Sequence, residues 1–398
     1  MLKDRLLYFA PNIPGLVGGN KLRAFQQIKI LSNRFNVVLV IVSYENMRDI
    51  PDYLFNYCED IKFFKLNYLN KLKIIKGVYD RNPLQIEFYR NKKVEQSIKS
   101  LINEYSNIKL VFVSHIRMVN YFKIIKNILN VPALFDFIDC YSRRFYDMSK
   151  VYSGFMKMIY KFEANTLQRF ELATLDLFDK SIITTTEDRA QIRDDENLYV
   201  FPQMVSLPKI SEDQKEKEFS ENILFFANMA SEVNISSVFY FYNKIFKKIL
   251  DKKPKCQLWI VGSNPPESLL KLSKSKNVIV TGFMQSLDQV YGIADVVISP
   301  LVYGSGIKNR VLEAMAYKLP VVATRLSNDG INAVEEEEIL IGDSPESFAN
   351  HVIRLLENEF FRKRLGVNSR KLIENNFSEE IMKEKYNKII TELLNSHE

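Results

Sequence analysis

Short apolar runs alternate with amphipathic stretches along the whole chain. In the first half, the runs expected to form strands lie at 6–9, 37–43, 62–65, 110–114, 133–137 and 181–184. In the second half, they lie at 222–227, 257–261, 278–281, 296–299, 321–323 and 339–341. Apolar residues at helical spacing separate them, for example over 20–33 and 93–105. This alternation predicts an α/β fold with parallel sheets that are covered by helices on both faces.

The length and one polar stretch divide this pattern into two domains. The chain has 398 residues, which suits two domains of roughly 200 residues better than one. Residues 202–221 contain two prolines and a run rich in Lys, Glu, Asp and Ser, which is typical of a linker. We therefore expect an N-terminal domain at 1–205, a C-terminal domain at 206–375 and a C-terminal helix at 376–398.

The charge of the chain is unevenly distributed. Hydrophobic residues make up 46% and charged residues 26%, a composition that excludes disordered and fibrous classes. The net charge is +7, and residues 1–200 carry 30 Lys and Arg against 22 Asp and Glu. A basic half indicates an anionic partner, which the charge alone leaves open between a membrane surface, a phosphorylated lipid and a nucleic acid. No nucleic-acid module accompanies the diffuse charge, so we expect no nucleic-acid partner.

The cysteines and the apolar runs indicate the cellular compartment of the protein. Cys58, Cys140 and Cys256 lie far apart without a pairing motif, which argues against a disulfide framework and a zinc site. No signal-peptide pattern precedes the first strand, and the longest apolar run is far below the ~20 residues that cross a bilayer. We expect a cytoplasmic protein, with peripheral binding at the inner face of the cytoplasmic membrane left open.

Two strand-to-helix loops stand out, and ligands of open parallel sheets bind at such loops. In the loop at 11–23, Gly18 and Gly19 allow close backbone approach, and Asn20 can cap the next helix. Its amides could receive phosphate or carboxylate, and Lys21 and Arg23 add positive charge. The alternative interpretation is a plain βα turn with a basic surface pair.

The second loop, at 300–316, follows an apolar strand and leads into a helix. Gly304 and Gly306 bracket the turn, and the amides of Gly306 and Ile307 are expected at the helix start, where an anion is favoured. Glu313 lies about two turns further along, and its carboxylate could accept hydrogen bonds from a ribose diol. The alternative is that Glu313 faces solvent. Its small, apolar neighbours argue against that and place this face near the sheet.

The ordered run from Thr281-Gly-Phe-Met through Ala294-Asp-Val-Val-Ile-Ser-Pro-Leu and Gly-Ser-Gly-Ile-Lys-Asn-Arg-Val-Leu-Glu-Ala-Met-Ala to Pro-Val-Val-Ala-Thr324 resembles the donor half of GT-B glycosyltransferases. The likeness is to the family-4-like group (glycosyl transferases group 1) associated with exopolysaccharide and capsule assembly. It implies two Rossmann-like domains facing across a cleft, with a C-terminal helix that crosses back to the N-terminal domain. Weaker likeness covers the loop with Gly18 and Gly19, the segment ending at Asp139, and 225–234.

The resemblance assigns roles to individual residues. Glu313 would bind the donor ribose and act in catalysis, and the loop after Gly282 and Phe283 would cover the base. Gly18, Gly19, Lys21, Arg23 and Asp139 would lie on the acceptor side. The remaining donor-binding residues are expected to be Gly304, Ser305, Gly306, Ile307, Lys308, Asn309 and Asn228.

The family resemblance also implies a reaction. It is a retaining transfer from a UDP- or GDP-linked sugar to a saccharide or polyprenyl-diphosphate-linked acceptor in surface polysaccharide synthesis. The helix dipole and Lys308 would stabilise the leaving diphosphate. No Asp-x-Asp metal loop is evident, so we predict no metal and no cofactor. Two alternatives remain, a nucleotide-sugar epimerase of the same fold and a non-catalytic nucleotide-sugar-binding subunit.

Two positions depart from the family pattern. Many relatives carry a Glu eight positions before the one equivalent to Glu313, where it contacts the transferred sugar, and here that residue is Ser305. Relatives also place Arg and Lys within the segment equivalent to 225–234 to neutralise phosphate, and this segment has neither. Lys308 or Arg310 could take over that task.

Two features of the basic half remain. His115 follows the strand at 110–114 and is expected at its carboxyl end, either as a catalytic acid/base group or as a loop histidine bonded to backbone. The stretch at 62–93 mixes Lys and Arg with Phe, Tyr and Leu. Its apolar residues have helical spacing, which favours an amphipathic surface element. This element either lies on anionic lipid or is simply a solvated basic face.

Overall fold

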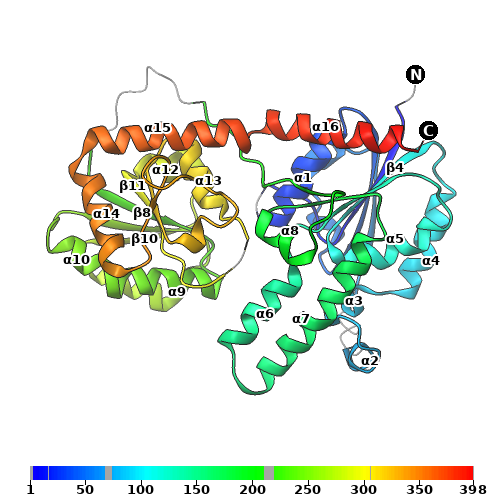
Figure 1. Ribbon diagram of the computed structural model, residues 1–398, viewed down its shortest axis with the longest axis horizontal. Helices are drawn as coiled ribbons and strands as arrows, with labels where there is room; N and C mark the ends of the chain where they lie inside the picture. The colour runs from blue at the N-terminus through cyan, green and yellow to red at the C-terminus, as the bar shows by residue number, and fades with distance from the viewer. Residues whose placement is uncertain (1–2, 17, 68–73, 210–218, 305, 398) are drawn as a thin grey trace. The chain divides into compact units, whose positions relative to one another are not determined.

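Two compact units make up the chain. The computed structural model describes residues 3–16, 18–67, 74–209, 219–304 and 306–397. Unit 1 consists of Met1–Pro202 together with Lys383–Glu398, and unit 2 of Gln203–Met382. Each unit has its own parallel sheet, shown in Figure 1, and its own hydrophobic core.

Unit 1 has a seven-stranded sheet in the order β3-β2-β1-β4-β5-β6-β7, in which every pairing is parallel. The strands are β1 (Arg5–Ala10), β2 (Asn36–Ser43), β3 (Asp60–Lys65), β4 (Ile108–Ser114), β5 (Ala133–Asp136), β6 (Lys180–Ile183) and β7 (Leu198–Val200). The helices are α1 (Gly19–Leu31), α2 (Ile74–Tyr79), α3 (Leu84–Tyr89), α4 (Lys92–Ile102), α5 (Val119–Lys126), α6 (Tyr141–Val151), α7 (Gly154–Leu175) and α8 (Thr186–Ile192). The sequence pattern had not predicted β7.

Unit 2 has a six-stranded parallel sheet in the order β10-β9-β8-β11-β12-β13. Its strands are β8 (Asn222–Phe226), β9 (Gln257–Val261), β10 (Val278–Gly282), β11 (Val296–Ser299), β12 (Val321–Ala323) and β13 (Leu340–Ile341). Its helices are α9 (Glu232–Tyr240), α10 (Lys247–Leu250), α11 (Glu267–Leu270), α12 (Leu287–Ile293), α13 (Asn309–Ala316), α14 (Pro345–Glu357) and α15 (Glu359–Asn376).

Alternation along the strands of unit 2 places apolar side chains on both faces of the sheet. On β8, Ile223 and Phe225 join the core beneath α9 and α14, whereas Leu224 joins the core beneath α12 and α13. Successive strand residues point to opposite faces, so helices must cover both sides. This arrangement confirms the α/β class and the two Rossmann-like sheets expected from the sequence.

The last helix, α16 (Glu379–Asn395), carries the chain back to unit 1. Its residues from Lys383 onward pack there, with Tyr386, Ile389 and Leu393 buried. This confirms the expected crossover of the C-terminal helix. Among the residues that the structure describes, no helix combines the length and apolar character needed to cross a membrane.

Candidate functional site

The loop between β11 and α13 is the first candidate, and its helix begins later than expected. We expected Gly306 and Ile307 at the helix start, but α13 begins at Asn309, with Lys308 as a cap that makes no side-chain bond to the helix. Gly304 and Gly306 have φ of 128° and 74°, a region that a residue with a Cβ rarely adopts, so they hold the turn outside the helix. Lys308 Nζ donates to the Gly306 carbonyl. Ser305 lies outside the described residues.

Glu313 lies in the second turn of α13 and faces α12. The Tyr291 hydroxyl donates to Glu313 Oε2 at 2.8 Å, and Tyr291 itself is buried. Burial raises the pKa of Glu313 to about 7, although the bond from Tyr291 and the charge of Arg310 oppose that rise. The carboxyl group is therefore held near the sheet. At neutral pH, it is divided between its protonated and ionised forms.

Arg310 lies one turn before Glu313 and reaches the neighbouring strands. Its Nη1 donates to Asn234 Oδ1 at 2.9 Å and its Nε to Ser299 Oγ at 3.4 Å. The guanidinium carbon lies 5.1 Å from the ring centre of Phe225, within cation–π distance. The Nη2 atom is buried and has no hydrogen-bond partner in the part of the chain that the structure describes. Burial lowers the pKa of Arg310 to about 10.

The loop after β8 is tied to this arginine. Asn234 Nδ2 donates to the Asn228 carbonyl at 2.8 Å, and Asn228 Oδ1 accepts from the Ala230 amide at 2.9 Å. The segment 225–234, which lacks basic residues of its own, therefore receives the positive charge of Arg310. Arg310, one of the two substitutes considered from the sequence, has its side chain bonded to this segment.

Two glycines bring the neighbouring loops close together. An added Cβ on Gly262 would lie 1.6 Å from the Ala227 carbonyl oxygen, so only glycine fits beside the segment that leads to Asn228. Gly262 N donates to the Gly282 carbonyl at 2.9 Å, which joins the ends of β9 and β10. Phe283 follows with 65% of its surface exposed. The carboxyl end of this sheet therefore combines a partly buried cation, a carboxyl group and an exposed aromatic ring.

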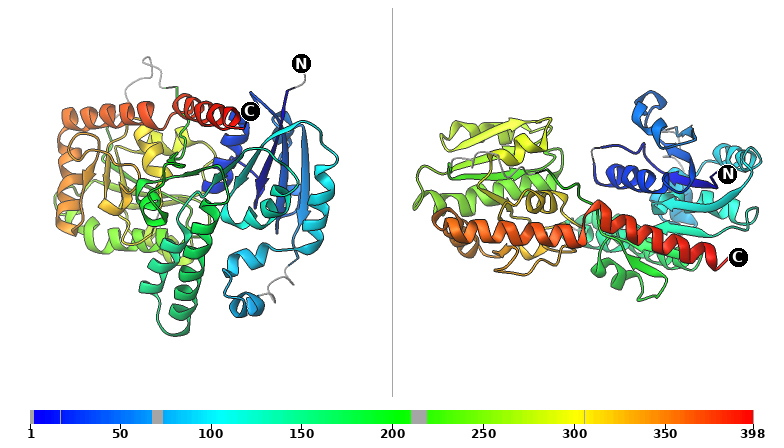
Figure 2. Two further views of the ribbon diagram at one scale, coloured as in Figure 1. Left: turned by 45° about the vertical axis from the view of Figure 1, so that its right-hand side comes forward. Right: turned by 90° about the horizontal axis from the view of Figure 1, so that it is seen from above.

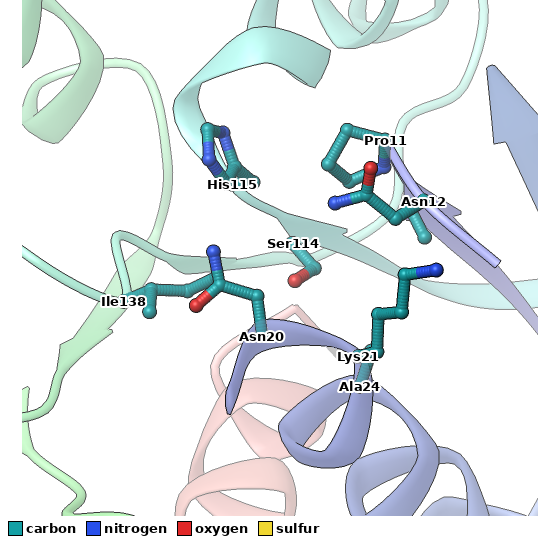
Figure 3. Close-up of a pocket in the computed structure, with 9 residues that line it drawn as sticks. Pro11, Asn12, Asn20, Lys21, Ala24, Ser114, His115 and Ile138 are labelled. Atoms are coloured by element: carbon teal, nitrogen blue, oxygen red, sulfur yellow. The ribbon is translucent and has the colours of Figure 1, made fainter. Parts of the chain in front are cut away.

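The second candidate is a pocket in unit 1 at the carboxyl ends of β1 and β4, shown in Figure 3. Its lining includes Asn12, Asn20, Lys21, Ser114 and His115. Gly18 caps α1 with a φ of 94°, and Gly19 is the first residue of that helix. Pro11, Asn12, Asn20 and Lys21 of the glycine loop thus line one pocket with His115, whereas Gly18 and Gly19 are not among its lining residues. Lys21 is not a free charge there, since its ammonium group pairs with Glu45.

His115 is wholly buried and has a left-handed φ of 79°. Its Nδ1 accepts from the Arg117 amide at 3.2 Å, so the proton of the neutral ring is on Nε2, 2.7 Å from the Tyr141 hydroxyl. Burial, together with Arg117 and Arg144, holds the pKa of His115 well below its ordinary value. Both ring nitrogens are engaged and the ring is neutral, the geometry of a histidine bonded to backbone.

Arg23, expected to add charge to the glycine loop, instead turns into the core of unit 1. Its Nε and Nη2 donate to the two carboxylate oxygens of Asp136 at 2.6 and 3.1 Å. Burial is the largest influence and lowers the pKa of Arg23, but Asp136, Tyr386 and Tyr8 together raise that pKa above its ordinary value. Gln27 donates to Asp136 and to the Tyr386 hydroxyl of α16. Arg23 is thus a core residue, because Asp136 already neutralises its charge.

Asp139 and the basic stretch at 62–93 complete the sequence-predicted features. Asp139 Oδ1 accepts from Thr184 Oγ1 at 3.4 Å. Burial, and next to it the charge of Asp139, raises the pKa of Asp188 to about 6. In the basic stretch, residues 68–73 lie outside the described part, and α2 begins at Ile74. Across the described chain, no three His, Cys, Asp or Glu side chains gather where they could hold a metal ion.

Residues 220–358 match the family described as Glycosyl transferases group 1. Over 164 residues, the chain is 24% identical to an uncharacterized 44.6 kDa protein in the cps region of Klebsiella pneumoniae, a match over 39% of this chain and 42% of that protein. It is also 26% identical to the capsular polysaccharide biosynthesis glycosyltransferase CapM of Staphylococcus aureus, over 38% of this chain and 42% of that one. The aligned part thus spans less than half the length of these two relatives.

Solved structures resemble the chain over nearly its whole length. Anabaena HepE in complex with UDP and glucose has a TM-score of 0.66 at 13% identity and covers 98% of this chain and 99% of its own. Sucrose-phosphate synthase from Thermosynechococcus elongatus has a TM-score of 0.72 at 15% identity, over 99% and 100% of the two chains. Identities this low show the fold alone. Residues 220–358 thus resemble the glycosyl transferases group 1 family, and the two parallel sheets of the chain have the GT-B fold.

Proposed function

We propose that the chain transfers a sugar from a nucleotide-sugar donor to a saccharide or lipid-diphosphate-linked acceptor. The single observation that carries the proposal is Arg310, a partly buried side chain whose Nη2 atom is buried and has no hydrogen-bond partner among the described residues. It lies at the carboxyl ends of β8 and β11, where Asn234 and Ser299 bond its other two nitrogens. A buried cation is unfavourable unless something pairs with it, and the diphosphate of a donor has the charge to do so.

The remaining groups of this loop fit the rest of such a donor. The first amides of α13 have no partner within the helix and favour an anion, and Lys308 adds a second cation. Glu313 can accept hydrogen bonds from the ribose, and the exposed ring of Phe283 offers a surface for the base. HepE, a structural relative, has UDP and glucose bound, which supports a UDP-linked donor here.

Loss of the diphosphate is the step that these residues would assist. As the bond from sugar C1 to phosphate breaks, positive charge develops on the sugar and negative charge on the leaving group. Arg310, Lys308 and the helix amides would stabilise that leaving group, so the proposed reaction requires no metal. We propose the retaining course that the family resemblance implies, in which the departing phosphate accepts the acceptor proton and no protein nucleophile is needed.

The buried His115 supports this course over chemistry centred on a histidine. A general base must be able to take a proton, and both ring nitrogens of His115 already have partners. We therefore propose that His115 shapes the pocket of unit 1, with the acceptor placed beside Asn12, Asn20 and Ser114. The cps-region and capsular relatives support surface polysaccharide synthesis as the setting of this reaction.

Acceptor-dependent turnover tests the proposed function. Incubation with UDP- and GDP-linked sugars is expected to release free nucleoside diphosphate only when a saccharide or polyprenyl-diphosphate acceptor is present. The Arg310→Met variant should not release it under the same conditions. Interconversion of the donor without an acceptor would support an epimerase instead. Binding without turnover on any acceptor would support the non-catalytic alternative.

The pKa of Glu313 predicts that donor binding depends on pH. Its pKa is about 7 in the free protein, and ribose hydroxyls donate to the ionised form, so binding lowers that pKa and releases a proton. The affinity for a nucleotide sugar is therefore expected to rise roughly tenfold from about pH 6 to about pH 8. Calorimetric titration at the two pH values measures it. A nucleotide sugar serves better than a free diphosphate, whose terminal phosphate itself titrates in this range.

The Glu313→Gln variant is the matched control for this pH dependence. Its amide does not titrate, so its affinity should be nearly constant across the same range. An equal rise in the variant and in the wild-type protein would contradict the assignment of Glu313 to the donor. Titration of Asp188, whose pKa is about 6 in unit 1, would not respond to this substitution.

A further inference from the structure

Helices α6 and α7 form a hairpin that extends from the sheet of unit 1, as Figure 1 and Figure 2 show. Its base is buried and bonded. Glu171 Oε1 accepts from the Ser142 amide at the start of α6 at 3.1 Å, and Cys140 Sγ donates to Glu171 Oε2. Further up, Glu163 accepts from the amides of Leu84 and Gln85. These buried bonds fix the hairpin to unit 1.

The far end of the hairpin is also folded, but its apolar residues face outward. Tyr160 packs against Tyr152 at 5.0 Å and against Phe145 at 5.9 Å between ring centres, which joins the two helices near the turn. Around this contact, Val151 is 60% exposed, Phe155 74% and Met158 68%. Tyr146 and Met156 are also exposed. We call residues 146–161 the hairpin tip.

Scattered exposed apolar residues are ordinary, but a cluster of them marks a site of interaction. The hairpin tip gathers these residues within one turn and two helix ends. The exposure of these side chains to water is unfavourable, and their burial against a hydrophobic partner would recover that free energy. The Lys150 ammonium group lies 4.3 Å from the ring centre of Tyr146, whereas Val151, Phe155 and Met158 remain the most exposed apolar residues of the tip.

The charge at the tip is positive. Lys150, Lys157 and Lys161 lie there with Asp147 as the single acidic residue. Arg144 precedes them on α6, and so does Arg143, which pairs with Asp188. Lys150 pairs with Asp147, whereas Lys157 and Lys161 are exposed and have no ion pair within the described residues. Glu163 and Glu171, the acidic residues further along α7, are buried and do not offset this surface charge.

We propose that the hairpin tip inserts into the surface of an anionic lipid bilayer. Apolar and aromatic side chains flanked by lysines are what the interface between headgroups and acyl chains accommodates. Anionic headgroups attract the lysines, each contributing to binding. A second copy of the chain fits less well, because two such tips carry like charges. Nucleic acid fits less well too, because phosphates would not cover Phe155 and Met158.

The proposed lipid contact lies in a different part of the chain from the one expected from the sequence. The sequence indicated the stretch at 62–93, where residues 68–73 lie outside the described part. The hairpin tip has the exposed apolar cluster and the unpaired lysines on described residues. Vesicle binding is measured without donor or acceptor, so the inference can fail or hold independently of the proposed transfer reaction.

Sedimentation with vesicles tests the proposal on the full chain. The protein is expected to bind phosphatidylcholine vesicles that contain phosphatidylglycerol, and to bind vesicles of phosphatidylcholine alone far more weakly. The double variant Phe155→Ser/Met158→Ser should lower the affinity for the anionic vesicles about thirtyfold. Lys157→Ser/Lys161→Ser should lower it about twentyfold. All four side chains are exposed, so both variants should keep the thermal stability of the wild-type protein.

Phe360 provides the matched control, since it is 78% exposed on α15 of unit 2. The Phe360→Ser variant should bind vesicles like the wild-type protein. A Phe155→Trp reporter should show a blue-shifted emission with anionic vesicles, whereas Phe360→Trp should not. The proposal is wrong if the wild-type protein ignores anionic vesicles, or if the tip variants bind as well as Phe360→Ser. It is equally wrong if the tip variants change only the oligomeric state.

Discussion

The Asp136→Ala variant is expected to lose about 3–5 kcal/mol of folding free energy, because it leaves the Arg23 guanidinium charged and buried. Arg23 is 2% exposed and both of its bonds to Asp136 are within the core. Gln27 and the Ile138 amide would also lose their acceptor. Typical domains have only about 5–15 kcal/mol of stability in total, so unit 1 should be close to unfolding. Denaturant titration measures the loss.

Two further variants separate this effect from the general loss of a carboxylate. Asp147→Ala breaks the exposed pair with Lys150 and should cost less than about 1 kcal/mol. Adding Arg23→Met to Asp136→Ala removes the orphaned charge and should restore part of the stability. If Asp136→Ala cost no more than Asp147→Ala, the buried pair would not have the role assigned to it. If Arg23→Met brought no recovery, an uncompensated charge would not be the cause.

The Arg310→Met variant is expected to weaken the binding of a nucleotide sugar about a hundredfold, the cost of removing one partner of a desolvated charge contact. Affinity for the nucleoside alone should hardly change, because Arg310 is assigned to the diphosphate. Met has a similar length and no charge, so the variant should be as stable as the wild-type protein or more so. Calorimetric titrations with UDP-sugar and with uridine, beside a thermal melt, measure all three quantities.

Arg354→Met is the control for this variant. Arg354 pairs with Glu336 on the surface of unit 2, so its loss should leave both affinities unchanged. Equal losses for the nucleotide sugar and for uridine in Arg310→Met would point to a general disturbance of the loop. Unchanged binding of both ligands would remove Arg310 from the site.

Most of the fold was predictable, because strands and helices each have their own spacing of apolar residues in the sequence. The parallel sheets followed from the alternation of apolar runs with helical stretches. The strand β7 was missed because Leu198–Val200 is too short to show a period. The start of α13 was placed too early, because Gly304 and Gly306 also serve a turn that precedes the helix. Backbone conformation at a glycine is set by its surroundings as much as by its neighbours in sequence.

The site was only partly predictable, because burial depends on distant segments. Arg310 and Glu313 are three residues apart on a helix, so a shared face could be inferred. That Arg310 reaches Asn234, however, depends on how α13 packs beside β8. Arg23 was expected to serve an anion, and nothing near it in the chain indicated Asp136 as its partner. At Phe155 and Met158, the sequence cannot distinguish a core helix from an exposed one.

Direct titration of donors tests the central claim, that the loop between β11 and α13 binds a nucleotide sugar. UDP- and GDP-linked sugars are titrated into the wild-type protein and into the Glu313→Ala variant, with melting curves to show that both are folded. We expect at least one nucleotide sugar to bind the wild-type protein, and Glu313→Ala to weaken that binding about tenfold or more. If no nucleotide sugar binds, or if the Glu313→Ala variant binds as tightly as the wild-type protein, the account of the donor site is wrong.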